Sequence, residues 1–231
     1  MMNSKLLSRR KLLAGAAGAA SLAAFSTPGM AQPSIALTPA QRKAELLAYA
    51  KMYAALPDER FPIPAVDLRL IDPAYLRRIG DYETTEPVGT VIVDTAQRVL
   101  FYTMPGGKAI RYGVGIGRAG FEWSGRGVIQ YKRKWPKWTP PADMIARQPE
   151  LLEQYSAANG GMPPGIDNPL GARALYIFKD GRDTLYRLHG TGDPQTIGKA
   201  VSSGCVRLLN QDVIDLYNRV PNHTPIVVMP E

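Results

Sequence analysis

The chain contains a single cysteine and two histidines in 231 residues. The stretch between His189 and Cys205 is rich in small residues and is long enough for a strand to end and for a loop to bring the thiol back to the imidazole. A cysteine is a strong nucleophile as its thiolate, and a neighbouring imidazole is a common way to generate one near neutral pH. We therefore expect Cys205 to be a nucleophile and His189 its general base. His223 falls in a predicted turn and is expected to face solvent.

The residues beside the thiol indicate what such a nucleophile would attack. Ser202, Ser203 and Gly204 leave room for a substrate to approach the backbone closely. The backbone N–H groups of Gly204 and Cys205 can stabilise an oxyanion, and Arg207 can bind a carboxylate through two hydrogen bonds. This combination points to acyl transfer on a substrate that carries free carboxylates.

No side chain is evident as the group that orients His189, so the backbone carbonyl of Gly190 is the candidate. A cysteine activated by an imidazole is expected to react with alkylating reagents below the pH at which a free thiol does. The alternative for Cys205 is a buried, inert cysteine, which is the ordinary role of an isolated cysteine.

The first 31 residues have the composition of an export signal. A basic stretch comes first, the apolar run 12–25 follows, and small residues close the segment at 29–31. The order Ser-Arg-Arg-Lys-Leu-Leu at 8–13 resembles the twin-arginine signal, and an ordinary Sec signal is the alternative. The apolar run is shorter than the roughly 20 residues that span a bilayer as a helix, so we expect no stable membrane anchor. The protein is expected to be periplasmic.

Composition limits the partners of the rest of the chain. The four positive charges of the leader make up half of the formal net charge of +8, and the remaining excess is too diffuse to indicate nucleic-acid binding. A lone cysteine in an exported protein cannot form an internal disulfide, which suggests that its thiol is used. No cluster of Cys and His has zinc spacing, so no metal is expected.

Short β-type runs dominate from residue 88 onward and predict a mainly β, sandwich-like domain over 88–231 with a few helices. Strands are predicted at 90–94, 98–102, 109–117, 127–131, 174–178, 184–189 and 226–229. Asn210 is the expected N-cap of a helix whose apolar residues repeat at helical spacing. The glycines at 113, 115 and 117 are expected to mark close approach of another backbone rather than a phosphate loop.

Two further segments flank this pattern. Residues 32–87 are predicted to be a helical or irregular N-terminal extension that packs against the main domain and contains an amphipathic helix at 39–55. Residues around 132–165 are predicted to be a flap-like insertion with one helix, or two short helices separated at Pro149. Trp135 and Trp138 either line a substrate groove or cover the edge of the core, since aromatic residues are favoured in both settings.

The catalytic stretch resembles a known family signature. His-Gly-Thr at 189–191, followed by Ser-Ser-Gly-Cys-Val-Arg at 202–207, is similar to the motif of the YkuD-type L,D-transpeptidases. The resemblance covers about residues 88–229 and implies a mainly β domain with its cysteine in a cleft under a flap. The resemblance implies that Cys205 is the nucleophile, that His189 is the base and that the backbone carbonyl of Gly190 orients the imidazole. Ser202 and Arg207 match the serine and the arginine of the motif. Ser203 stands where the usual motif has a second histidine, which leaves His189 as the one candidate base.

The resemblance also implies a reaction. Cys205 would attack the carbonyl of the third residue of a peptidoglycan stem peptide, release D-alanine and pass the acyl group to an amine of another stem or of an envelope protein. The residues expected to contact substrate are Arg207, Ser202, Ser203, Trp135 and Trp138. No metal or organic cofactor is implied, and a monomer is expected. Two alternatives stay open: a hydrolase or amidase that uses the same thioester, and a non-catalytic cell-wall binding module.

Overall fold

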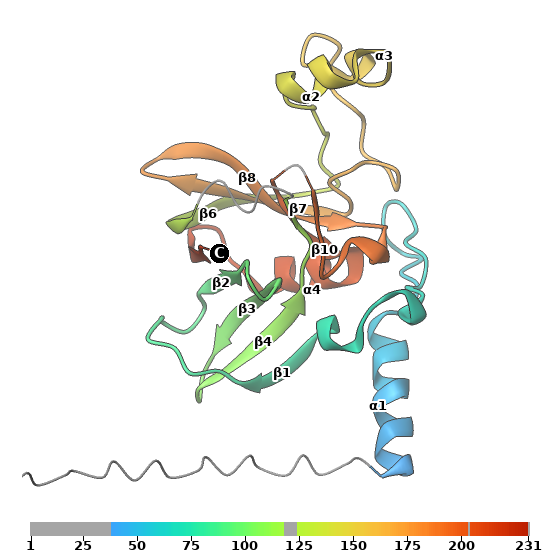
Figure 1. Cartoon of the computed structure of the whole chain (residues 1–231), viewed down its shortest axis with the longest axis vertical. Helices are drawn as coiled ribbons and strands as arrows, with labels where there is room; N and C mark the ends of the chain where they lie inside the picture. The colour runs from blue at the N-terminus through green and yellow to red at the C-terminus, as the bar shows by residue number, and fades with distance from the viewer. Residues whose placement is uncertain (1–37, 118–123, 203, 231) are drawn as a thin grey trace, which may run out of the picture. The chain divides into compact units, whose positions relative to one another are not determined.

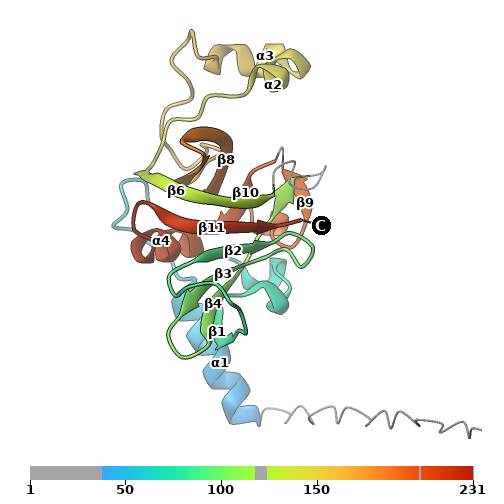
Figure 2. The ribbon, with the colours of Figure 1, turned by 90° about the vertical axis from the view of Figure 1, so that its left-hand side faces the viewer.

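A computed structural model describes residues 38–117, 124–202 and 204–230, and the predicted leader lies outside them. The mainly β prediction is confirmed: nine strands form one curled sheet in the order β1-β4-β3-β2-β11-β6-β7-β8-β10, and β5 pairs with β9 (Figures 1 and 2). The strands are β1 (Arg78–Asp81), β2 (Val91–Asp94), β3 (Val99–Met104), β4 (Lys108–Gly113), β5 (Ile116–Gly117), β6 (Gly125–Lys134), β7 (Arg173–Lys179), β8 (Arg182–Thr191), β9 (Ala200–Ser202), β10 (Val206–Leu209) and β11 (Thr224–Met229). The helices are α1 (Pro39–Met52), α2 (Ala142–Arg147), α3 (Pro149–Leu152) and α4 (Asn210–Arg219), with short 3₁₀ turns at Leu68–Leu70, Pro73–Tyr75, Glu153–Tyr155 and Pro194–Thr196.

Helix α4 packs against β7 and β8. In the chain it directly follows β10, the strand that begins just after Cys205. Its apolar residues Val213, Leu216 and Val220 are fully buried in the main core, as their spacing predicts. The predicted cap is wrong, because the N-cap position is Leu209 and makes no side-chain hydrogen bond. Asn210 instead lies in the first turn, and its Oδ1 accepts a hydrogen bond of 2.9 Å from the N–H of Ala172. The amide therefore holds the start of β7 rather than the start of the helix.

Two glycines after β3 lie against other backbone segments, which confirms the predicted close approach. A Cβ at Gly113 would overlap the backbone and Cβ of Tyr75, and one at Gly115 would overlap the carbonyl of Thr196. Contacts this tight leave no room for a methyl group. The predicted continuous strand at 109–117 accordingly divides into β4 and β5.

Gly113→Ala is expected to lower the free energy of unfolding by roughly 1–3 kcal/mol, because the added methyl group forces Tyr75 away from the sheet. Gly80→Ala, in the neighbouring strand β1, is the matched control, since nothing lies within 4 Å of its added Cβ. We expect that control to shift stability by at most about 0.5 kcal/mol. Urea unfolding of both variants measures the difference, and equal midpoints would show that Tyr75 moves at no cost.

The N-terminal segment differs from its prediction in two ways. Most of helix α1 does not pack, because it has no buried residue and Leu46 and Leu47 are 66% and 62% exposed. Only Tyr49 and Met52, near its C-terminal end, pack on the apolar cluster described below. Figure 1 shows α1 extending away from the strands. Segment Arg78–Asp81, for which no strand was predicted, forms β1 and pairs antiparallel with β4 at the edge of the sheet.

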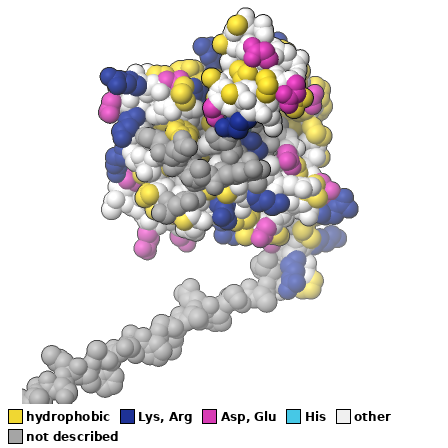
Figure 3. Space-filling view, turned by 45° about the horizontal axis from the view of Figure 1, so that its top comes forward, with side chains coloured by type: hydrophobic (Ala, Val, Ile, Leu, Met, Phe, Trp, Pro, Cys, Tyr) yellow, Lys and Arg dark blue, Asp and Glu magenta, His cyan; other side chains and the backbone are white. Residues whose placement is uncertain are grey.

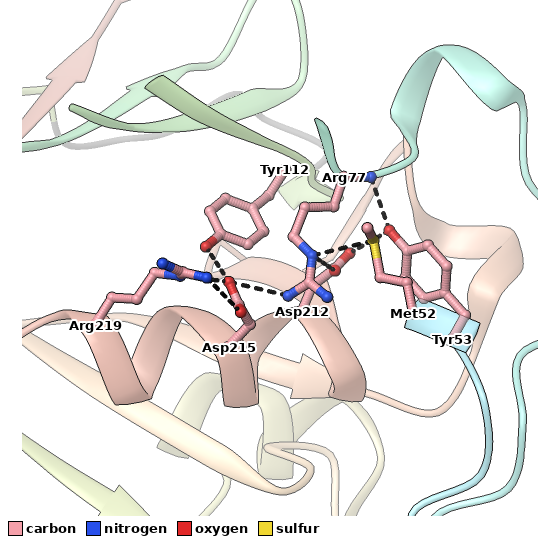
Figure 4. A network of polar contacts seen from close by, with 7 residues as sticks. All are labelled: Met52, Tyr53, Arg77, Tyr112, Asp212, Asp215 and Arg219. Atoms are coloured by element: carbon pink, nitrogen blue, oxygen red, sulfur yellow. Dashed lines mark hydrogen bonds and ion pairs between the residues drawn. The ribbon is translucent and has the colours of Figure 1, made fainter. Parts of the chain in front are cut away.

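The part of this segment that packs is the stretch between α1 and β1. Tyr53, Ile71 and Leu76 form a small apolar cluster with Ile197 and Leu209, the last residue of β10. Arg77 adds a buried ion pair to two carboxylates of α4, Asp212 and Asp215, as Figure 4 shows. The N-terminal segment is thus anchored to the helix and strand that directly follow the cysteine.

Arg77 is the centre of this polar cluster. Its Nε lies 3.5 Å from Asp212 Oδ1, and its Nη1 lies 2.9 Å from Asp215 Oδ2. Tyr53 donates a hydrogen bond of 3.1 Å to Asp212 and accepts one of 2.8 Å from the backbone N–H of Arg77. Tyr112 donates one of 2.6 Å to Asp215. Burial raises the pKa of Asp212 to about 7, although Arg77 and Tyr53 lower it.

The insertion between β6 and β7 holds α2 and α3, and both views show it projecting past the ends of these strands (Figures 1 and 2). The two short helices meet at Pro149, as predicted. Trp138 and Met162 pair at the base of the insertion through two backbone hydrogen bonds of 3.0 and 2.7 Å. Apolar and acidic side chains lie side by side on its surface, where Leu151 is 58% exposed (Figure 3). Within the described ranges, no helix has the length and apolar character needed to cross a membrane.

Candidate active site

Parallel pairing of β10 with β8 brings the two candidate catalytic segments together. Val206 pairs with Leu188, and Arg207 pairs with His189. On its other side His189 pairs with Ala174 of β7, so the histidine lies in the interior of the sheet rather than at an edge. Cys205 directly precedes the first paired residue of β10, which places the thiol at the point where the β8–β10 ladder begins.

The imidazole of His189 is buried, with 4% of the residue exposed. Its Nδ1 lies 2.9 Å from the carbonyl oxygen of Gly190, the contact that the sequence analysis proposed. A carbonyl only accepts hydrogen bonds, so Nδ1 carries the proton in this contact and Nε2 is left as the basic nitrogen. Burial lowers the pKa of His189 to about 4; the Gly190 carbonyl opposes this shift and the charge of Arg207 adds to it. The imidazole is therefore neutral near pH 7.

The Cys205 sulfur lies against strand β8. Its Sγ is 3.9 Å from the carbonyl oxygen of Leu185, within reach of a weak S–H···O hydrogen bond. Burial raises the pKa of the thiol, while the backbone N–H of Arg187 and the charges of Arg187 and Arg207 offset part of the rise. At neutral pH the Cys205 thiol and the His189 imidazole are thus both uncharged, whereas the sequence predicted a preformed thiolate. Desolvation disfavours each ion, and a neutral imidazole can still take the proton during attack.

The alkylation of Cys205 by iodoacetamide should show this directly. We expect the rate to rise with pH around a midpoint above that of the urea-unfolded chain, because burial raises the pKa of the thiol and only the thiolate reacts. Since Cys205 is the sole cysteine, the unfolded chain is an internal control. A folded midpoint below the unfolded one would instead indicate a thiolate paired with imidazolium in the resting enzyme.

Gly204 directly precedes Cys205, and Arg207 follows it on β10. Gly204 has φ +127°, which side chains rarely tolerate, so its backbone conformation favours glycine; a Cβ there would lie 3.2 Å from the ring of Tyr186. Arg207 is half-buried, and burial lowers its pKa while Cys205 and Asp193 raise it. Ser202 pairs through its backbone with Gly117. Ser203 lies outside the described residues.

The two predicted tryptophans occupy different environments. Trp135 is 4% exposed and packs in a small cluster with Ile63 and Ala172. Its Nε1 donates a hydrogen bond of 2.9 Å to Glu59. This position fits the alternative in which Trp135 covers the core. Trp138 is half-buried at the base of the insertion. His223 is exposed in the turn before β11, as predicted.

Two features near the site were not predicted from the sequence. Arg187 and the carbonyl of Leu185 both reach Cys205 from β8, although the sequence shows them as ordinary strand residues. A cavity of about 520 Å³ opens between the segments 63–67, 166–169, 191–194 and 209–211. Thr191 lines it, whereas neither His189 nor Cys205 does. The N-terminal segment therefore shapes a cavity beside the loop that follows the histidine.

Comparisons with known proteins give a consistent family. "Probable L,D-transpeptidase YbiS" of Escherichia coli K12 is 37% identical over 147 residues, which cover 62% of this chain and 45% of that protein. "Probable L,D-transpeptidase ErfK/SrfK" of the same strain is 33% identical over 145 residues, which cover 60% and 43%. The chain thus spans less than half the length of these curated relatives.

A crystal structure from Brucella melitensis, described as a probable carnitine operon oxidoreductase, is 39% identical and superposes with a TM-score of 0.48 over 71% of this chain and 99% of that one. Its description concerns the Brucella protein, and an overlap at this TM-score does not decide a function. The sequence profile of the YkuD L,D-transpeptidase catalytic domain matches residues 89–228, more than half of the chain. The chain belongs to the YkuD-type L,D-transpeptidase catalytic-domain family.

Proposed function

We propose that this protein is an exported peptidoglycan L,D-transpeptidase that uses Cys205 as its nucleophile and His189 as its general base. The observation that carries the proposal is the β8–β10 register, which pairs Arg207 with His189 and sets Cys205 at the start of the same ladder. Family membership supports the reaction class. The catalytic domain is proposed to span 88–231, with residues 1–31 as its leader and the periplasm as its location.

The proposed reaction has two acyl-transfer steps. Nε2 of His189 takes the proton of the Cys205 thiol as the sulfur attacks the carbonyl of the third stem residue. The imidazolium then gives that proton to the departing amine, so D-alanine leaves and a thioester forms. An amine of a second stem or of an envelope protein attacks the thioester, His189 removes its extra proton, and the thiol is restored. Backbone N–H groups at Gly204 and Cys205 would bind the oxyanion.

The residues proposed to contact substrate are chosen by their charge and by their position relative to Cys205. Arg207 is half-buried beside the thiol, and a cation there can bind a stem carboxylate. Ser202, Ser203 and Trp138 are proposed to contact the stem peptide. Trp135 is buried against Phe61 and Ile63 of the N-terminal segment, so it would contact substrate only if that segment moved.

Incubation with a defined disaccharide tetrapeptide, followed by mass spectrometry of protein and products, tests the proposal. We expect an acyl-enzyme that has lost D-alanine, and a cross-linked dimer between two third residues when a second stem is present. Release of tripeptide alone, even with acceptor amine in excess, would establish the hydrolase alternative. Binding without any covalent species would establish the non-catalytic module and refute the proposal.

A further inference from the structure

Strand β8 contains a bulge beside the cysteine. Across the β7–β8 ladder, Tyr176 pairs with Arg187 and Phe178 pairs with Asp183, so the single residue Ile177 faces the three residues 184–186. Leu185 at its centre has φ +64°, a left-handed conformation that costs a non-glycine residue about 1 kcal/mol or more. The Leu185 side chain is 76% exposed. No packing of that side chain accounts for the strained backbone.

An ion pair clamps the bulge. Arg187 donates two hydrogen bonds of 2.7 Å to the carboxylate of Asp183, and Asp183 also accepts one of 2.8 Å from the N–H of Leu185. In a regular strand, residues four apart are about 13 Å from each other, so this pair forms only because the chain is bulged. Arg187 also stacks on the ring of Tyr176 at 4.4 Å.

Thr184 adds two hydrogen bonds that hold the bulge. Its Oγ1 donates a hydrogen bond of 2.6 Å to the carbonyl of Ile177 and accepts one of 3.2 Å from the N–H of Tyr186. Hydrogen bonds, an ion pair and ring stacking therefore hold one strained conformation. Such over-determined strain is concentrated at functional sites.

The bulge presents two backbone groups to the thiol. The carbonyl of Leu185 lies 3.9 Å from Sγ. The backbone N–H of Arg187, two residues later in the same bulge, lowers the pKa of the thiol. The carbonyl suits the protonated thiol, which donates, and the N–H suits the thiolate, which accepts. The charged groups that face the sulfur are Arg187 from β8 and Arg207 from β10, and both lower its pKa.

We propose that the clamped bulge at 183–187 is a positioning device for Cys205, with Arg187 as a positioning residue. In the resting enzyme the Leu185 carbonyl orients the S–H. When the proton moves from Sγ to Nε2 of His189, the Arg187 N–H and guanidinium charge hold the sulfur anion in the same place. This inference builds on the proposed cysteine chemistry and adds to it the groups that aim the nucleophile.

Two sets of variants test it. Arg187→Gln is expected to raise the pH midpoint of Cys205 alkylation by about 0.5–1 unit and to lower kcat roughly tenfold with KM unchanged. Arg187→Lys should shift the alkylation midpoint less than Arg187→Gln does, because it keeps the positive charge. Arg182→Gln is the matched control, since Arg182 is an exposed arginine of the same strand.

The second set changes only the backbone preference of the exposed Leu185. Leu185→Gly fits a positive φ and should change the midpoint and kcat less than Leu185→Val does. Leu185→Val disfavours that conformation and should raise the midpoint and lower kcat, as Arg187→Gln does. These variants decide the question even if Arg187→Gln does not fold.

Unchanged midpoints and kcat in Arg187→Gln and Leu185→Val would overturn the inference. So would a loss of thermal stability or a rise in KM as the only effect. Alkylation needs no peptidoglycan, so the two proposals fail separately. A wild-type protein inert toward muropeptides, whose midpoint still shifts in Leu185→Val, would refute the proposed function and leave the positioning role intact.

Discussion

Cys205→Ala is expected to eliminate the covalent intermediate and to lower transfer of stem peptides by at least roughly 10⁴-fold, because no other thiol exists in the chain. The fold should persist, since the sulfur occupies the start of a ladder whose paired residues are unchanged. Intact-protein mass spectrometry after exposure to a carbapenem gives the sharpest readout. The wild type should gain the mass of one acyl group, and Cys205→Ala none.

His189 offers a matched comparison, because the chain has one other histidine. His189→Asn should lower acylation by several orders of magnitude, since it removes the nitrogen that accepts the thiol proton. His223→Asn should leave acylation unchanged, because His223 is exposed and asparagine tolerates its φ of +65°. The double variant at Cys205 and His189 should be no slower than Cys205→Ala, as expected when both residues act in one step. Acylation of Cys205→Ala at the wild-type rate would refute the assigned nucleophile.

Arg77→Met is expected to produce the largest loss of stability, roughly 3–5 kcal/mol at pH 8. The substitution keeps most of the side-chain volume but leaves the fully buried Asp212 without its cation. Asp215 would suffer less, because it keeps a bidentate contact with Arg219 and the hydroxyl of Tyr112. Urea unfolding monitored by circular dichroism measures the loss.

The loss should depend on pH in a defined direction. The pKa of Asp212 is raised to about 7 in the folded protein from an ordinary value of 3.8, so the folded state binds this proton more tightly. The stability that protonation of Asp212 contributes is therefore complete below about pH 4 and is lost as the pH rises through 7. Below pH 7 Asp212 becomes neutral and tolerates the missing cation, so the penalty of Arg77→Met should shrink.

Arg69→Met is the control for this prediction. Arg69 lies in the same segment and also pairs with an aspartate, but its side chain is 89% exposed. We expect no measurable change in its urea midpoint, because solvent screens an exposed pair. Equal midpoints for Arg77→Met and wild type at pH 8 would show that the buried cluster does not anchor the N-terminal segment.

The sequence by itself determined the features that depend on local pattern and on residue type. The hairpin of β2 and β3, the break at Pro149 and the buried face of α4 follow from side-chain alternation, proline geometry and helical spacing, which act over a few residues. The candidate pair His189 and Cys205 emerged because few residue types perform nucleophilic chemistry and this chain has few of them. Gly113 and Gly115 predicted close packing against another backbone, but the sequence did not identify which segment would pack there.

Tertiary structure alone decided what depends on distant neighbours. Helix α1 has a helical sequence, but whether it is covered depends on what packs on it, and most of it stays exposed. The side chain of Arg77 becomes largely covered because α4, more than 130 residues later, supplies Asp212 and Asp215. The bulge at Leu185 arises from pairing with β7, and it brings Arg187 to the thiol. The charge states of Cys205 and His189 follow the same rule, because desolvation is set by the whole fold rather than by the motif that contains them.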